Sequence, residues 1–184
     1  METRALETKM ETTQNRTIKG YALKWGTRSN DLGGFVETLE PESLAKTDLT
    51  DVRAFIDHEP SKIIGRTTSG TLRLDVDDIG LRFEVDVPKT SYGDDLLEMV
   101  NRGDITGCSF GMVVPDGGAK WTKEDGTYLR SITEISRLWE ISIVTMPAYE
   151  DTNVEVAKRE LSDEKTREAS DILFLELELL ELDI

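Results

Sequence analysis

The side chains of this sequence that could carry out a reaction together are an imidazole, a hydroxyl and a carboxylate. The only histidine is His58, which directly follows the short apolar segment VRAFID. If that segment is a strand, the imidazole lies at the strand end, where a cleft can reach it. Histidine changes its charge near neutral pH, so His58 is the candidate general base. A single histidine is also compatible with a purely structural position.

The candidate nucleophile is Ser109, in the segment TGCSFGM. This segment follows a glycine-containing turn and has the composition of a strand, so the hydroxyl would be held on rigid backbone. Cys108 is the rival nucleophile. Adjacent residues of a strand face opposite sides, so only one of the two can meet His58, and buried packing suits Cys108 better.

The third candidate is Glu140, which is the one charged residue of the apolar segment LWEISIVTM. An unpaired carboxylate buried in such a strand is very costly, so Glu140 must be paired or lie at an opening. It could orient the imidazole of a catalytic histidine. The alternative is a purely structural ion pair with one of three arginines, Arg66, Arg130 and Arg137.

Other carboxylates compete with Glu140 for this role, namely Asp57, Glu59 and Glu134. Glu134 is favoured by a count along an expected hairpin centred near residue 121, which places Thr133 or Glu134 opposite Ser109. A bulge in the hairpin would shift that count. From the residues alone, Glu134 and Glu140 therefore both remain candidates.

Short segments rich in β-branched and aromatic residues predict a mostly β domain over residues 17–154. The clearest hairpin covers residues 71–87, and residues 91–103 predict an amphipathic helix with Ser91 as its N-cap and Gly103 at its end. A second hairpin is expected to begin at residue 104 and return from residue 128 to Pro147. LWEISIVTM should be a central strand, buried on both faces.

The two ends of the sequence differ in composition from this domain. Residues 1–16 are charged and have few large apolar side chains, which predicts a flexible leader. Residues 155–184 contain ten acids and four bases and form an acidic amphipathic tail. The apolar residues of this tail fit either a helix or a strand, and the tail is as compatible with partner binding as with packing on its own domain.

The composition narrows the classes of function. With 22 Lys and Arg against 37 Asp and Glu, the net charge is −15, which repels a phosphate backbone and disfavours nucleic acid as a partner. One cysteine excludes an internal disulfide, and no metal-ligand spacing is found, so no cofactor is expected. No apolar segment reaches the length of a membrane span, and we expect a soluble protein of the cytoplasm.

Three segments together resemble those of one enzyme family. HEPSKIIGRT, the strand with GCSFGM, and LWEISIVTMPAYEDT, in this order and spacing, resemble the prohead maturation proteases of HK97-type tailed bacteriophages. The segment GYALKWGTRSNDLGGFVETLEPESL resembles the opening of these proteases, so the resemblance covers about residues 17–153. These proteases are similar in fold to herpesvirus assemblins. The resemblance therefore implies an α+β, mostly β fold with a closed or partly open β-barrel of about seven strands, flanked by helices.

The resemblance also implies a serine endopeptidase, with His58 as the family's histidine and Ser109 as its nucleophile. Phage relatives have an acid where assemblins have a second histidine, and Glu140 takes that place in EISIVTMP, which favours it over Glu134. The backbone N–H of Ala148 is the expected oxyanion donor, because Pro147 before it has no N–H.

The implied substrates are the major capsid protein with its scaffolding segment, other prohead proteins and the protease itself, all cut inside the assembling prohead in the host cytoplasm. The charged ends, 1–16 and 155–184, are candidates for self-cleavage, and the acidic tail is a candidate for recruitment to the shell. Assemblins dimerise, which suggests a homo-oligomer by analogy.

Two alternatives belong to other classes of function. The first is a non-enzymatic phage assembly or scaffolding protein whose β-barrel core serves only to bind partners. The second is a hydrolase that uses Cys108, which would be inactivated by thiol alkylation and would tolerate Ser109→Ala.

Overall fold

The computed structural model describes residues 1–146 and 155–182. The chain divides into two compact units, residues 1–153 and 154–184. The first unit is mostly β, and the second contains one helix, α2 (Glu155–Leu182). The tail that fitted either a helix or a strand is therefore helical. No helix in the described part of the chain is long and apolar enough to span a membrane.

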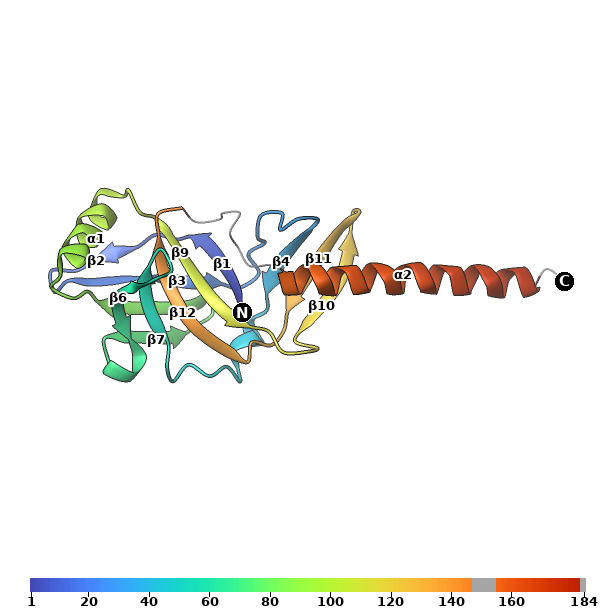
Figure 1. Cartoon of the computed structure of the whole chain (residues 1–184), viewed down its shortest axis with the longest axis horizontal. Coiled ribbons are helices and arrows are strands. Elements are labelled where there is room, and N and C mark those ends of the chain that lie inside the picture. The colour runs from blue at the N-terminus through green and yellow to red at the C-terminus, as the bar shows by residue number, and fades with distance from the viewer. Residues whose placement is uncertain (147–154, 183–184) are drawn as a thin grey trace. The chain divides into compact units, whose positions relative to one another are not determined.

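A five-stranded sheet of the first unit carries all three candidate residues. Ser109 and Glu140 lie in its strands, and His58 lies in a turn between two of them. Its strand order is β1-β9-β12-β5-β6. The strands are β1 (Glu2–Glu7), β9 (Gly107–Val113), β12 (Arg137–Val144), β5 (Arg53–Ile56) and β6 (Glu59–Arg66). β12 lies between β9 and β5 (Figure 1), so the predicted central position of LWEISIVTM is confirmed.

The other strands form two smaller sheets. The four-stranded sheet has the order β2-β3-β8-β7, and the three-stranded sheet has the order β10-β11-β4. The first contains β2 (Glu11–Thr12), β3 (Thr17–Lys24), β8 (Gly80–Asp86) and β7 (Leu72–Val76). The second contains β10 (Ala119–Glu124), β11 (Thr127–Ile132) and β4 (Phe35–Leu39). β7 and β8 pair antiparallel, which confirms the hairpin predicted over residues 71–87.

Short helices complete the first unit. α1 (Ser91–Arg102) confirms the predicted helix, but its N-cap is Thr90, whose side chain accepts a hydrogen bond from the N–H of Gly93. The helix ends at Gly103, which has the left-handed φ of 79° that glycine tolerates. Two 3-10 helices, η1 (Pro41–Leu44) and η2 (Thr67–Ser69), lie in connections.

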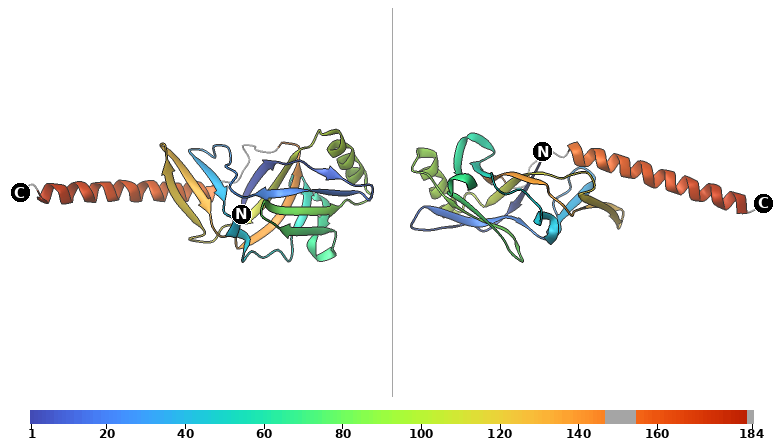
Figure 2. Two further views of the ribbon diagram at one scale, coloured as in Figure 1. Left: turned by 180° about the vertical axis from the view of Figure 1, so that it is seen from behind. Right: turned by 90° about the horizontal axis from the view of Figure 1, so that it is seen from below.

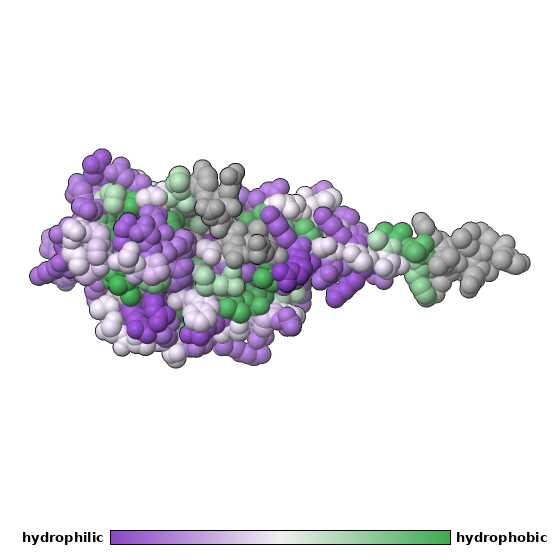
Figure 3. Space-filling view, in the orientation of Figure 1, coloured by the Kyte–Doolittle hydropathy of each residue, from purple (hydrophilic) through white to green (hydrophobic). Residues whose placement is uncertain are grey.

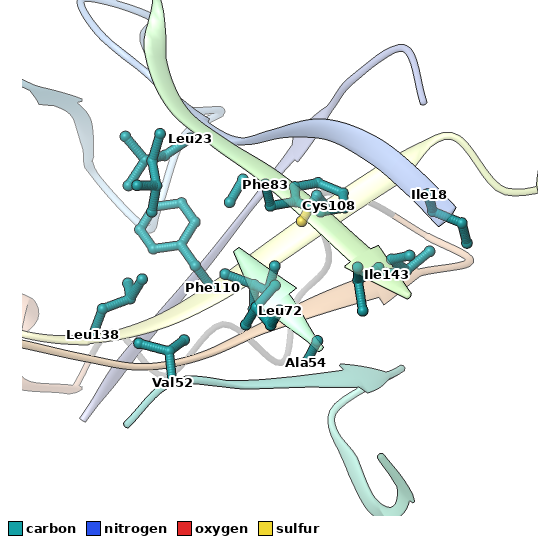
Figure 4. Packing of buried hydrophobic residues seen from close by; sticks show 14 of the residues in the cluster. Ile18, Leu23, Val52, Ala54, Leu72, Phe83, Cys108, Phe110, Leu138 and Ile143 are labelled. Carbon is teal, nitrogen blue, oxygen red and sulfur yellow. The ribbon is translucent and has the colours of Figure 1, made fainter. Parts of the chain in front are cut away.

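One face of the five-stranded sheet packs on the hydrophobic core. Cys108, Phe110 and Met112 of β9 alternate with the candidate nucleophile and belong to the core together with Ile141 and Ile143 of β12. Phe83 of β8 packs in the same cluster, and Figure 4 shows it beside Cys108. Because neighbouring strand residues face opposite sides, Ser109 lies on the face that is turned away from this core.

The expected β-barrel is not found. The described strands number more than seven and form three separate sheets, and the edge strands β1 and β6 of the largest sheet do not pair with each other. The mostly β character with flanking helices is confirmed. Alternation of apolar residues predicts where strands are, but it does not determine which sheet edges meet.

The predicted second hairpin is right in pairing the strand of Ser109 with LWEISIVTM, but it is wrong in its register and in its single return strand from residue 128. β9 pairs with β12, whereas β10 and β11 pair with each other and join β4 (Figure 2). The turn between β10 and β11 is Asp125-Gly126, with φ angles of 49° and 83°, which is typical of a tight two-residue hairpin. This short hairpin takes residues 119–132 away from β9, so Ser142 rather than Thr133 or Glu134 lies opposite Ser109.

The prediction of a flexible leader over residues 1–16 is also wrong, because residues 2–7 form β1 on the edge of β9 and residues 11–12 form β2. The charged side chains of Glu2 and Arg4 are buried. They pair with Glu37 and Arg130, so their charges are compensated inside the protein.

Candidate active site

His58 lies at the tip of a strained hairpin turn. β5 and β6 are joined by the two residues Asp57 and His58, whose φ angles are 46° and 58°. This is the backbone of a type I′ turn, which usually takes Asn-Gly or Asp-Gly. A non-glycine residue in this conformation costs about 1–2 kcal/mol. Strain of this kind is common at functional sites, where it holds a side chain in place.

Asp57 fastens this turn to the end of β12. Its N–H donates to the carbonyl of Ile143 at 3.0 Å, and its Oδ1 accepts from the N–H of Thr145 at 2.8 Å and from the Thr145 hydroxyl at 3.2 Å. Asp57, a rival for the role of triad acid in the sequence, thus anchors the turn that carries His58.

His58 and Glu140 are joined by a short hydrogen bond, with 2.6 Å between His58 Nδ1 and Glu140 Oε1. An ionised carboxylate can only accept, so Nδ1–H is the donor, and in the neutral imidazole Nε2 then carries the lone pair. The Glu140 side chain is 9% exposed and that of His58 is 36% exposed. The buried acid therefore holds an imidazole that solvent can reach.

Two further residues of the sheet surround the Glu140 carboxylate. Ser142, two residues along β12 on the same face, donates its hydroxyl to Glu140 Oε2 at 2.8 Å. Gly111 lies opposite Glu140 on β9, and a Cβ there would be 3.1 Å from Glu140 Cγ. The lack of a side chain at residue 111 thus makes the space in which the carboxylate lies.

The ionic partners proposed for Glu140 bind elsewhere. Arg130 pairs with Glu2 and Glu37, Arg66 pairs with Asp51, and Arg137 stacks on Trp139 at 3.5 Å. The competing acids also have other partners. Glu134 Oε2 lies 3.7 Å from Lys46 Nζ, and Glu59 Oε2 lies 3.2 Å from Lys62 Nζ. Among the candidates for the third member, the structure brings Glu140 to His58.

Ser109 lies on the same sheet face as this pair. It is 1% exposed and is the cross-strand neighbour of both Ser142 of β12 and Ala5 of β1. Its hydroxyl donates to the backbone carbonyl of Arg4 at 2.8 Å. In this state the β1 backbone therefore holds the candidate nucleophile, one strand away from the Glu140–His58 pair.

Cys108 is in a different environment. It belongs to the hydrophobic core (Figure 4). As the neighbour of Ser109 in the same strand, it faces the opposite side of the sheet. Burial raises the pKa of the Cys108 thiol far above its usual range, and the negative charge of Glu140 adds to this effect. A thiol that stays protonated is a poor nucleophile.

The remaining sequence predictions concern the segment after β12 and metal binding. Pro147 and Ala148 lie outside the described residues. In the described part of the chain, no group of three or more His, Cys, Asp or Glu side chains could hold a metal ion. Sequence reasoning missed Ser142, although the spacing E-x-S on a predicted strand places its hydroxyl on the face of Glu140.

The comparisons with known proteins address the class of this site. Residues 2–167 match the family model described as caudovirus prohead serine protease. The chain belongs to this family. The resemblance to phage prohead proteases is thus confirmed, and the protease is a serine endopeptidase of capsid maturation, which overturns the non-enzymatic alternative. No curated protein and no solved structure matches the chain.

Family membership also places the protease in its biological setting. A prohead protease acts within the assembling procapsid in the host and has a capsid protein as substrate. The family match includes β1 and the first part of α2, residues 155–167, as well as the strands that carry the candidate residues.

Proposed function

We propose that this protease cleaves peptide bonds with a triad of Ser109, His58 and Glu140. The observation that carries the proposal is the 2.6 Å hydrogen bond between His58 Nδ1 and Glu140 Oε1. It joins the only imidazole of the chain to a buried carboxylate and leaves Nε2 to take a proton. Ser109 is supported as the nucleophile because it lies on the same face, opposite Ser142, whose hydroxyl binds the same carboxylate.

The reaction begins when the Ser109 hydroxyl leaves the Arg4 carbonyl by rotation about its Cα–Cβ bond and turns to His58. Nε2 takes the hydroxyl proton while Oγ attacks the scissile carbonyl carbon. His58 then gives the proton to the leaving amine. In the second half of the reaction, His58 takes a proton from water as the water attacks the acyl carbon. His58 then returns this proton to the Ser109 oxygen as the acyl-enzyme bond breaks. Glu140 stays ionised and stabilises the imidazolium. The backbone N–H of Ala148 is the proposed donor to the oxyanion that forms on the scissile carbonyl oxygen.

The proposed substrates are the scaffolding segment of the major capsid protein, other prohead proteins and the protease itself, inside the prohead in the host cytoplasm. We expect the protease to cleave itself within residues 155–184 rather than within residues 1–16. Cleavage within β1 requires the strand to leave the sheet and its buried ion pairs, so the N-terminal end is a poor substrate.

The acidic tail is proposed to recruit the protease to the assembling shell. Four neighbouring apolar side chains of α2 are exposed (Figure 3), namely Ile172, Leu173, Phe174 and Leu175. Deletion of residues 160–184 should leave cleavage of a peptide unchanged and abolish incorporation into proheads. Loss of both peptide cleavage and incorporation into proheads would contradict the proposed role of the tail.

The triad is tested by co-expression of the protease with its capsid protein. Ser109→Ala should lower cleavage by at least about 10³-fold while the circular dichroism spectrum stays that of the wild type. His58→Ala should have a similar effect. Ser69→Ala, an exposed serine of η2, is the matched control and should cleave at the wild-type rate. Full activity of Ser109→Ala would refute the assignment of the nucleophile.

A further inference from the structure

Ser142 lies on β12, two residues after the proposed acid Glu140. It is fully buried, and its hydroxyl donates to Glu140 Oε2 at 2.8 Å. The other oxygen of the same carboxylate, Oε1, accepts from His58 Nδ1. Each carboxylate oxygen thus has its own donor, and the two donors come from different strands or turns of the sheet.

This arrangement fixes a side chain that is otherwise mobile. The terminal torsion of a glutamate is broad and roughly two-fold, so a single hydrogen bond does not determine the plane of the carboxylate. Two donors on two different oxygens do determine it. On the side of β9, the Glu140 carboxylate faces only the backbone of Gly111, which has no side chain that could hold it in place.

Ser142 is unsuited to be the nucleophile itself. Its hydroxyl is directed to the acid and not to the imidazole, and a proton shared with a carboxylate is not transferred to a base on the far side of that carboxylate. It also does not serve merely to fill space, because an alanine would fill the position without a buried hydroxyl that needs a hydrogen-bond partner.

We propose that Ser142 is a positioning residue of the active site, whose hydroxyl fixes the plane of the Glu140 carboxylate so that Oε1 faces Nδ1 of His58. The role of Glu140 in catalysis rests on the proposed triad. The hydrogen bond network itself does not depend on which residue is the nucleophile, so the two ideas can be tested separately.

The test combines kinetics with proton NMR. His58 is the only histidine, so the chain has a single imidazole Nδ1–H signal, which a short bond to a carboxylate moves downfield and protects from exchange. The spectra are recorded in a Ser109→Ala background to prevent self-cleavage. Addition of Ser142→Ala should broaden or abolish this signal, while Ser142→Thr, which keeps the hydroxyl, should retain it.

In the otherwise wild-type protease, Ser142→Ala should lower kcat by about 10- to 100-fold and change KM by less than about twofold, because the chemistry is misaligned while the peptide still binds. Ser142→Thr should recover most of kcat. The matched control is Ser43→Ala, which removes another fully buried serine hydroxyl, one that has no hydrogen-bond partner in the described residues. It should leave both kcat and the imidazole signal unchanged.

Each other outcome has a distinct meaning. An unchanged imidazole signal and an unchanged kcat per folded molecule in Ser142→Ala would refute the positioning role. Complete loss of activity equal to that of Ser109→Ala, with the imidazole signal intact, would instead identify Ser142 as a nucleophile and also refute it. If Ser109→Ala retains activity, the proposed triad is refuted, and the NMR comparison still decides the role of Ser142.

Discussion

Gly111 determines how closely β9 can approach the Glu140 side chain. A Cβ at this residue would lie 3.1 Å from Glu140 Cγ and 3.4 Å from Oε1, so Gly111→Ala must displace the carboxylate by a few tenths of an ångström. Alanine normally stabilises a strand relative to glycine by about 0.5–1 kcal/mol. The substitution should therefore lower kcat by about tenfold without lowering the midpoint of urea unfolding.

The control for this prediction is Gly20→Ala in β3. There a Cβ would also lie 3.1 Å from a side-chain atom, Cγ of Met10, so the crowding is matched but the residue belongs to a different sheet. Activity should be unchanged in this variant. Equal losses of activity in the two variants would show that crowding alone, and not the position of Glu140, causes the effect.

Cys108 should be inert in the folded protease. Because burial raises the pKa of the thiol, the reactive thiolate is scarce at neutral pH, and the core covers the sulfur. Treatment of the native protein with iodoacetamide should label less than about a tenth of the thiol in the time that labels it fully in urea, with no loss of peptidase activity. Rapid native labelling with inactivation would favour a cysteine hydrolase.

The sequence allowed part of the site to be predicted at this scale. His58 and Glu140 could be named as candidates because one is the only histidine and the other is the only acid of an apolar strand. The choice of Glu140 over Glu134 came from the resemblance to phage prohead proteases and not from the residues alone. The Ser142 hydroxyl was available from the E-x-S spacing and was overlooked. The acceptor of the Ser109 hydroxyl could not be predicted, because the Arg4 carbonyl belongs to the backbone and no side-chain pattern marks it.

The turn between β5 and β6 is the element on which the position of His58 depends. Asp57 tolerates its left-handed backbone and also accepts two hydrogen bonds from Thr145. Asp57→Ala loses both advantages, and we expect it to lower the free energy of unfolding by about 1–3 kcal/mol and kcat by about tenfold or more.

Asp57→Asn distinguishes geometry from charge in this turn. Asparagine also favours the left-handed region, and its side-chain oxygen can accept from the Thr145 N–H. Urea unfolding and peptide cleavage should both remain close to wild type. A loss in Asp57→Asn as large as that in Asp57→Ala would show that the negative charge, rather than the shape of the turn, is required.

Strand pairing was the least predictable property of the elements. The strands of residues 71–87 could be paired because a short turn joins them, whereas β9 and β12 are separated by a complete hairpin. Asp125-Gly126 is a strong signal for a tight hairpin, and it indicates that residues 119–132 pair locally. This local pairing is incompatible with the symmetric count that places Thr133 or Glu134 opposite Ser109.

A buried group of four charges joins β1 to the rest of the first unit. Glu2 and Arg4 of β1 bind Glu37 of β4 and Arg130 of β11, with distances of 2.6–2.8 Å. Burial alone would raise the pKa of Glu2, but hydrogen bonds and attraction from Arg130 and Arg4 lower it below its ordinary value of 4.5. Ionised Glu2 therefore stabilises the fold above that pH, and this contribution is lost as the pH falls through the lower folded value.

Urea unfolding between pH 7 and pH 3 checks this contribution, in the Ser109→Ala background so that no self-cleavage occurs. At pH 7, Glu2→Gln should lower the free energy of unfolding by about 1–3 kcal/mol, because Arg130 loses one charged partner and keeps Glu37. The difference from the parent should narrow below pH 4.5. A difference that stays constant over this range would show that Glu2 acts through packing rather than through its charge.

The strand that carries Ser109 is hydrogen-bonded on one side to residues 2–7 and on the other to residues 137–144. Partners this distant in sequence cannot all pair until the ribosome has released every residue through Val144. In each copy of the chain, the proposed site therefore forms late in synthesis. Capsid protein that meets a nascent copy of the protease before this point meets a chain in which the strands of the proposed triad are not yet paired.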